Sequence, residues 1–260
     1  MIRKKGKSLC IFGAKGGVGK TSTTINMAGI FETIEKKVLI IDMDLSGGGI
    51  ATALNTPFTS TIYNFVDDYS NNRYKDFKNY ITTYDKFIDI LPCPKDPRQA
   101  NKIDSKYIDI LLDKALYNYD IVLIDTNHDL DEKNLVILDN VDLILFIMTN
   151  DPLDIKNMKS LVSIFRDLEK TNYKILLNNS INPYKKYFSL FDLRNILKSN
   201  IDYTLSSEFF LKNFDEYVMN GKIISLEPKM PNIFAKDFST MMSIAADVTK
   251  EKEENPHDEE

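Results

Sequence analysis

Residues 8–33 constrain the fold more than any other segment, because they join an apolar run, a glycine-rich loop and a helix-forming stretch without interruption. The apolar run at residues 8–12 predicts a buried strand, and residues 20–33 predict a helix. Glycines within residues 13–19 allow backbone N–H groups to surround an anion without Cβ clashes, and the following helix start adds partial positive charge. This order of strand, loop and helix predicts a phosphate-binding loop.

The end of this loop has the side chains that a bound nucleotide requires. We expect Lys20 to reach the β- and γ-phosphates, Thr21 to bind Mg²⁺ and Ser22 to contact the α-phosphate. One position departs from the strict motif, because Ala14 stands where that motif has its first glycine. A glycine-rich turn without a ligand is the alternative, but the strand before it and the helix after it favour a nucleotide site. The predicted nucleotide contacts in the loop are Gly13, Ala14, Lys15, Gly16, Gly17, Val18, Gly19, Lys20, Thr21 and Ser22.

Beyond the loop, apolar runs alternate with helical stretches along most of the chain. Further buried strands are predicted at residues 38–42, 87–91, 121–125, 143–148 and 174–178, and helices at 62–69, 108–117, 152–169, 206–219 and 234–250. Strands that are apolar on both faces and separated by helices indicate a parallel sheet. The predicted fold class is therefore α/β, with a doubly wound, mostly parallel sheet flanked by helices. In such sheets, ligands bind beyond the carboxyl ends of the strands.

Acidic and amide residues lie at several of these strand ends. Asp42 and Asp44 lie at the end of the second strand, Asp125 ends the fourth strand, and Asn178 ends the sixth. A phosphoryl-transfer site needs carboxylates to hold Mg²⁺ and to position water in line with the γ-phosphate. Solvated aspartates and a turn asparagine are the alternatives. For the amide, the adjacent Asn179 is a second candidate, so the sequence leaves open which of the two asparagines contacts the ligand.

A second lysine early in the loop narrows the prediction. Residues 15–21 are Lys-Gly-Gly-Val-Gly-Lys-Thr, and this segment resembles the deviant Walker A signature of the ParA/MinD family of partitioning and positioning ATPases. The resemblance implies a P-loop NTPase of the SIMIBI type, ATP and Mg²⁺ as ligands, and a homodimer in the ATP state. In that family the early lysine, here Lys15, reaches the nucleotide of the partner subunit. A solvated loop lysine is the alternative.

The resemblance also implies roles for the residues at the strand ends. Asp44 would orient or activate the attacking water, and Asp42 would lie near the Mg²⁺ shell. Asp125 ends a strand that is similar to Walker B and would hold Mg²⁺ through water, whereas Asn178 matches a position where relatives contact adenine. The catalytic residues implied are Lys15, Lys20 and Asp44, and the metal residues implied are Thr21, Asp42 and Asp125.

Three other segments resemble one subgroup of the family. Residues 91–97, 127–130 and 150–157 are similar to those of CpaE/TadZ-like proteins, which localise pilus-assembly machinery. The resemblance implies a weak, Mg²⁺-dependent ATPase that dimerises with ATP and positions or recruits a cellular machine through a protein partner. Where many relatives continue Walker B with Thr-Pro-Pro, this chain has Thr-Asn-His, which leaves the hydrolysis rate open. His128 is either catalytic or a loop histidine that packs near the site.

The net charge helps to compare the other functions that occur in the family. Lys and Arg total 33 against 38 for Asp and Glu, so the net charge is -5, and the overall field does not favour nucleic acid or anionic lipid. A DNA-partitioning ATPase would need a local basic patch, for which residues 185–186 are a candidate. A MinD-like positioning ATPase would need a C-terminal amphipathic helix that is basic on one face. A scaffold that binds ATP with little hydrolysis would need neither a basic patch nor an amphipathic helix. Nucleic acid is therefore an unfavoured partner, but the sequence does not exclude it.

The sequence also predicts where the protein is located and how the chain divides into domains. The sequence has no apolar stretch long enough for a signal peptide or a membrane span, and Cys10 and Cys93 lack metal-ligand spacing. We expect a cytoplasmic protein that reaches the membrane periphery or a cell pole only through a partner. We also expect a single P-loop ATPase domain at residues 1–250 and an acidic, disordered tail at residues 251–260.

Overall fold

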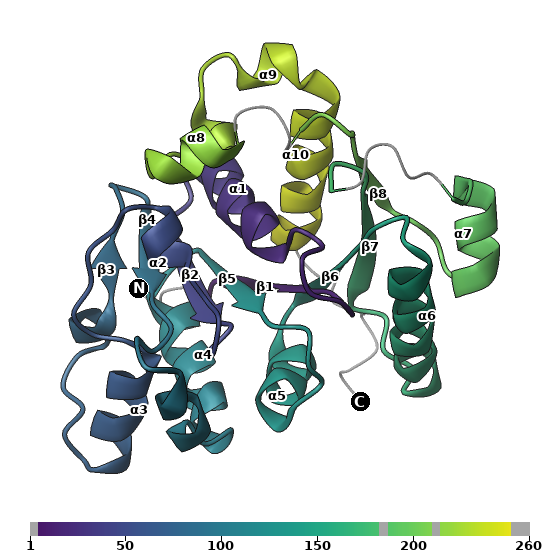
Figure 1. The fold of residues 1–260 in the computed structure, drawn as a ribbon. Helices are drawn as coiled ribbons and strands as arrows, with labels where there is room; N and C mark the ends of the chain where they lie inside the picture. Colours follow the sequence, from purple (N-terminus) through teal and green to yellow (C-terminus); the bar gives the residue numbers. More distant parts are fainter. Residues whose placement is uncertain (1–4, 182–186, 210–213, 251–260) are drawn as a thin grey trace, which may run out of the picture.

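The computed structural model describes residues 5–181, 187–209 and 214–250. These residues form an eight-stranded sheet in the order β3-β4-β2-β5-β1-β6-β7-β8, with helices on both faces (Figure 1). The strands are β1 (Lys7–Phe12), β2 (Val38–Met43), β3 (Thr82–Thr83), β4 (Ile88–Leu91), β5 (Ile121–Thr126), β6 (Leu143–Met148), β7 (Tyr173–Asn178) and β8 (Tyr203–Leu205). The α-helices are α1 (Lys20–Thr33), α2 (Ile50–Ala53), α3 (Ile62–Ser70), α4 (Lys106–Asn118), α5 (Glu132–Asn140), α6 (Pro152–Asp167), α7 (Leu190–Leu197), α8 (Phe214–Met219), α9 (Met230–Ile233) and α10 (Ala235–Thr249), and the 3₁₀ helices are η1 (Phe77–Tyr80), η2 (Pro97–Lys102) and η3 (Ile224–Leu226).

The pairing of the strands confirms the predicted fold class. All neighbouring strands run parallel except β3, which pairs antiparallel with β4 at one edge of the sheet. Each of the six predicted strands is present. The sequence did not predict β3 and β8, because strands of 2 and 3 residues are too short to show a periodic pattern.

The two faces of the sheet pack into two separate cores. Along β1, Leu9 and Ile11 pack with residues of α1 and α10, whereas Cys10 and Phe12 pack with residues of α4 and α6. Figure 1 shows the same division, with α1 and α10 on one side of the sheet and α4, α5 and α6 on the other. Successive strand residues point to opposite faces, so the continuously apolar strands supply both cores.

A late segment of the chain packs directly on α1. Ser225, in η3, donates its backbone N–H to Oδ1 of Asn26 at 2.9 Å and its hydroxyl to the carbonyl oxygen of Asn26 at 2.7 Å. A Cβ on Gly29 would lie 2.3 Å from the hydroxyl of Ser225, so this close approach requires glycine in the helix. The helix that begins at the phosphate-binding loop is thus covered by η3 and α10, which come much later in the chain.

Some local predictions fail or fall outside the described residues. The helix predicted at residues 206–219 is wrong at its start, because residues 206–209 are not helical and the carboxylate of Asp237 accepts the N–H and hydroxyl of Ser206 at 2.6 Å each. The prediction matches the described helix α8 at Phe214–Met219. The short helices α5 and α7 were not predicted. Residues 185–186 and 251–260 lie outside the described residues. Within the described part of the chain, no helix combines the length and apolar character needed to cross a bilayer.

Candidate functional site

The loop between β1 and α1 has a backbone shape that requires glycine. Gly17 and Gly19 have φ angles of 74° and 98°, in the left-handed region that side chains disfavour. A Cβ on Gly13 would lie 2.9 Å from both the carbonyl oxygen of Ile147 and a methyl group of Val18. The tight turn thus accounts for the glycines at these positions, as a phosphate-binding loop requires.

Two threonines of α1 bind the carboxylate at the end of β5. The Thr21 hydroxyl donates to Oδ2 of Asp125 at 2.7 Å, and the Thr24 hydroxyl donates to Oδ1 at 3.1 Å. Burial raises the pKa of Asp125 to about 6, although both hydroxyl bonds and the charge of Lys20 oppose this rise. Thr24 was not predicted as a site residue, yet its position three residues after Thr21 puts both on one helix face.

Asp42 is a second buried carboxylate and lies beside Asp125 in the register of β2 and β5. It is 1% exposed, its Oδ2 accepts the N–H of Ile50 at 3.1 Å, and its Oδ1 has no hydrogen-bond partner among the described residues. Burial, and then the charge of Asp125, raises the pKa of Asp42 to about 7, although the N–H of Ile50 and the thiol of Cys93 oppose this rise. A buried carboxylate oxygen without a partner is costly unless a proton or a cation meets it.

These residues fit a magnesium ion. Mg²⁺ prefers hard oxygen ligands and is commonly held by one or two carboxylates together with phosphate oxygens and water. The structure brings Thr21 and Asp125 into contact, and the unpartnered Oδ1 of Asp42 lies on the neighbouring strand. The backbone also approaches this oxygen closely, since a Cβ on Gly48 would lie only 2.2 Å from it. The donor set is therefore suited to the metal that the sequence predicts.

Lys20 lies among these carboxylates. Burial lowers the pKa of its ammonium group, while the charges of Asp125, Asp44 and Asp154 act in the opposite direction. Its Nζ donates to the carbonyl oxygen of Lys15 at 3.4 Å, which is a long and weak hydrogen bond. The buried cation at the loop is thus weakly held by the protein, which suits a group that binds phosphate.

Asp44 and His128, unlike Asp42 and Asp125, are not buried. Oδ1 of Asp44 accepts the N–H of Gly47 at 3.1 Å, so this half-buried carboxylate closes the turn that follows β2. The His128 side chain is 53% exposed, and its imidazole lies 3.9 Å from the position that a Cβ would take on Gly16. His128 therefore lies beside the phosphate-binding loop, exposed to solvent.

Lys15 forms an ion pair with Asp151 of the same chain. Its Nζ lies 3.0 Å from Oδ1 of Asp151, and the two side chains are 39% and 26% exposed. Asp151 also caps α6 by accepting the N–H groups of Leu153 and Asp154. The Lys15 ammonium, followed by these backbone bonds, lowers the pKa of Asp151. Asp151 was not predicted as a site residue, although an aspartate before Pro152 is a strong signal for a helix start.

Of the two adjacent asparagines, Asn178 contacts the loop. Its Nδ2 donates to the carbonyl oxygen of Val18 at 3.0 Å, and its Oδ1 accepts from the N–H and hydroxyl of Ser180. The side chain of Asn179 instead donates to the carbonyl oxygen of Leu205 at 3.0 Å. The geometry thus favours Asn178 as the site residue, while its contact with adenine stays a prediction.

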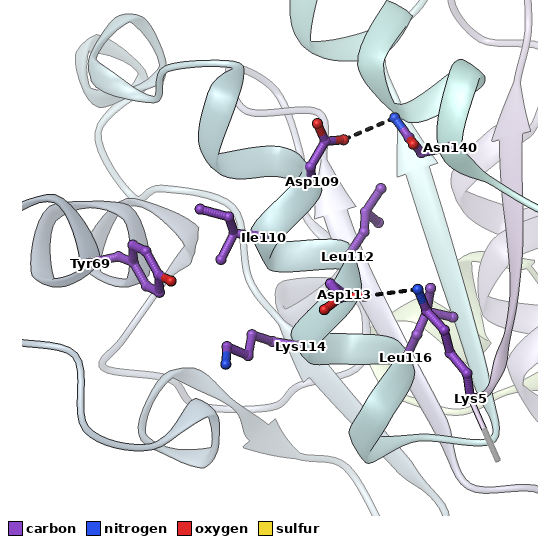
Figure 2. Close-up of a pocket in the computed structure, with 9 residues that line it drawn as sticks. All are labelled: Lys5, Tyr69, Asp109, Ile110, Leu112, Asp113, Lys114, Leu116 and Asn140. Atoms are coloured by element: carbon purple, nitrogen blue, oxygen red, sulfur yellow. Dashed lines mark hydrogen bonds and ion pairs between the residues drawn. The ribbon is translucent and has the colours of Figure 1, made fainter. Parts of the chain in front are cut away.

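Two cavities differ in their relation to this site. One of about 360 Å³ adjoins Asp42 and is also lined by Gly48, Gly49, Phe58, Cys93 and Lys95. Another of about 450 Å³ lies along α4 (Figure 2), where Lys5 binds Asp113 at 2.8 Å and Asn140 donates to Asp109 at 2.9 Å. No predicted site residue lines this second cavity, so it is separate from the candidate site at the edge of the sheet where Asp42 and Asp125 lie.

The sequence of residues 6–182 matches the family model described as an AAA domain. The chain belongs to the ParA/MinD family of P-loop ATPases. This family member is 41% identical over 61 residues to the chromosome partitioning protein ParA of Myxococcus xanthus, a match that covers 22% of the chain and 21% of that relative. It is 30% identical over 141 residues to the tyrosine-protein kinase YwqD of Bacillus subtilis, covering 54% of the chain and 58% of the relative.

Solved structures of family members share the fold of this chain. A ParA family ATPase from Chlorobium tepidum superposes with a TM-score of 0.79 at 16% identity, covering 92% of this chain and 98% of that one. The septum site-determining protein MinD of Pyrococcus horikoshii, in complex with Mg-ADP, superposes with a TM-score of 0.75 at 17% identity, covering 94% and 96%. The ParA/MinD chain thus has the family fold over nearly its whole length.

Proposed function

We propose that this ParA/MinD family member is a Mg²⁺-dependent ATP hydrolase whose ATP state is a homodimer. Lys20 would bind the β- and γ-phosphates, and Asp44 would hold the attacking water in line with the γ-phosphorus. Attack by water breaks the bond between the γ-phosphorus and the bridging oxygen, which releases ADP and phosphate. Thr21, Asp42 and Asp125 would hold Mg²⁺, which neutralises phosphate charge when it is bound.

The observation that supports a dimeric switch most strongly is the ion pair between Lys15 and Asp151. Lys15 belongs to the loop, yet it points to the first turn of α6 and stays partly exposed. A triphosphate carries more negative charge than one carboxylate, so the nucleotide of a second subunit would compete with Asp151 for this cation. ATP would thereby favour the dimer, and loss of the γ-phosphate would release it.

Size-exclusion chromatography with light scattering, in ATP and in ADP, tests this function. We expect wild type to dimerise in ATP only, and Asp44→Ala to form a long-lived ATP dimer because hydrolysis is slowed. Lys15→Ala should lose both dimerisation and turnover. A Lys15→Ala protein that keeps both would contradict the role of Lys15 across the dimer.

We further propose that the dimer recruits or positions a cellular machine, as CpaE/TadZ-like proteins do. Two of the segments that resemble that subgroup flank the nucleotide site, because Cys93 lines the cavity beside Asp42 and Asp151 binds Lys15. A protein partner that contacts these segments would sense the nucleotide state. The protein would then work in the cytoplasm, at the membrane periphery or a cell pole, through this partner. A fluorescent fusion that forms foci as wild type but is diffuse as Lys15→Ala would support this role.

Chromosome partitioning is the second candidate, because one curated relative is a chromosome partitioning ParA and another is the chromosome-partitioning ATPase Soj of Thermus thermophilus. Retention of the ATP state on DNA, lost as salt rises, would favour this function. ATP-dependent binding to anionic vesicles would instead indicate membrane positioning. Normal ATP affinity without phosphate release would indicate a scaffold.

A further inference from the structure

The side chain of Asn178 connects two segments of the nucleotide site. The residue is 1% exposed, and its Nδ2 donates to the carbonyl oxygen of Val18 at 3.0 Å. Its Oδ1 accepts the N–H of Ser180 at 3.1 Å and the Ser180 hydroxyl at 2.5 Å. An amide recognises a base most specifically when both its oxygen and an N–H group are available to the ligand. Here the oxygen and one N–H are engaged within the protein.

The bond to Val18 fixes the orientation of a loop peptide. A trans peptide is planar, and its C=O and N–H groups point in opposite directions. Because Asn178 holds the carbonyl oxygen of Val18, the N–H of Gly19 points away from Asn178. The contact is close, since a Cβ on Gly19 would lie 2.5 Å from Nδ2 of Asn178. Gly19 precedes the first residue of α1, where loop N–H groups bind phosphate.

We propose that Asn178 is a positioning residue for the phosphate-binding loop, which orients the N–H of Gly19 toward the phosphates whatever base the nucleotide carries. This inference rests on the proposed nucleotide binding and gives Asn178 a role other than the expected adenine contact. Loss of the side chain should therefore weaken every ligand that has a phosphate chain by the same factor.

Calorimetric titration separates the two roles. The ligands are ATP, GTP and inorganic tripolyphosphate, each with Mg²⁺, and the variants are Asn178→Ala, Asn178→Asp and the matched control Asn179→Ala. Asp keeps the acceptor for Ser180 but cannot donate to Val18. We expect Asn178→Ala to bind all three ligands about tenfold more weakly, the size of one lost buried hydrogen bond. Asn178→Asp should bind them more weakly still, because its carboxylate also repels the carbonyl oxygen of Val18 and the phosphates. The control should bind them as wild type does. Weaker binding of ATP with unchanged binding of tripolyphosphate would overturn the inference.

Amide hydrogen exchange in nucleotide-free protein gives an independent readout. We expect both Asn178 variants to exchange faster than wild type and Asn179→Ala at residues 16–22, with equal exchange in β1 as the check on folding. Unchanged exchange at residues 16–22 would overturn the positioning role. If wild type binds none of the three ligands, the proposed nucleotide function fails, whereas the exchange result still decides the role of Asn178 in the loop.

Discussion

A single carboxylate oxygen, Oδ1 of Asp151, binds Nζ of Lys15 at 3.0 Å and also accepts two N–H groups from the first turn of α6. The negative charge therefore lies at the positive end of a helix while it holds the lysine. In the proposed dimer, a phosphate of the other subunit would compete with Asp151 for the Lys15 ammonium. We therefore expect dimer formation to weaken this ion pair.

Asp151→Asn should therefore strengthen the ATP-dependent dimer. Asparagine still caps the helix, so α6 should stay intact, but it no longer attracts Lys15 as an ion. Partly exposed ion pairs contribute about 0.2–1 kcal/mol each, and a homodimer has two of them, so the dimer dissociation constant should fall about two- to thirtyfold. Sedimentation velocity across a concentration series measures it. Asp167→Asn, at the other end of α6, is the control, and equal dimer constants in both variants would argue against this competition.

Thr24→Val should lower stability, whereas Thr23→Val should not. Both side chains are fully buried, but the Thr24 hydroxyl lies 3.1 Å from both Oδ1 of Asp125 and the carbonyl oxygen of Lys20, whereas the Thr23 hydroxyl has no hydrogen-bond partner among the described residues. Thr24→Val leaves Asp125 less satisfied and should cost about 1–3 kcal/mol, while Thr23→Val removes an unsatisfied group and should be neutral or stabilising. Urea denaturation of the pair measures the difference. Equal losses would mean that the Asp125 bond does not matter.

Gly48→Ala should disrupt the metal residues, and Gly49→Ala should not. A Cβ on Gly48 would lie 2.2 Å from Oδ1 of Asp42, whereas a Cβ on Gly49 would have nothing within 4 Å. Gly49 also has a φ of -163°, which any residue adopts. We expect Gly48→Ala to lower Mg²⁺-nucleotide affinity at least tenfold and Gly49→Ala to match wild type, measured by titration with Mn²⁺ as a paramagnetic probe. Matching affinities would remove Asp42 from the metal site.

The metal-free protein should be stabilised by mild acid through Asp42. Its pKa rises from 3.8 to about 7 on folding, so the folded state holds this proton more tightly than the unfolded chain. The resulting stabilisation is complete below about pH 4 and is lost as pH rises through 7. With EDTA present, the unfolding free energy of wild type should therefore fall between pH 5 and 8 relative to Asp42→Asn. A constant difference across that range would contradict the raised pKa.

The site residues that the sequence predicted share one property: each lies in, or next to, an apolar run or a glycine-rich loop. The loop follows an apolar run, and Asp42 and Asp125 end apolar runs, so the parallel-sheet rule alone brings them to one edge. The contacts that the sequence did not predict join distant segments. Lys15 and Asp151 are 136 residues apart, and Asn178 and Val18 are 160 residues apart. Such contacts depend on how loops and helix ends pack, which no local pattern records.

The packing of η3 on α1 has a consequence for how the chain is made. The bonds between Asn26 and Ser225 span 199 residues, so the cover of α1 is translated long after the helix itself. At about 5–20 residues per second, this delay is roughly 10–40 s on the ribosome. During this delay, the face of α1 that includes Gly29 is not yet packed against η3. The helix that starts the nucleotide site is thus synthesised well before the segment that packs on it.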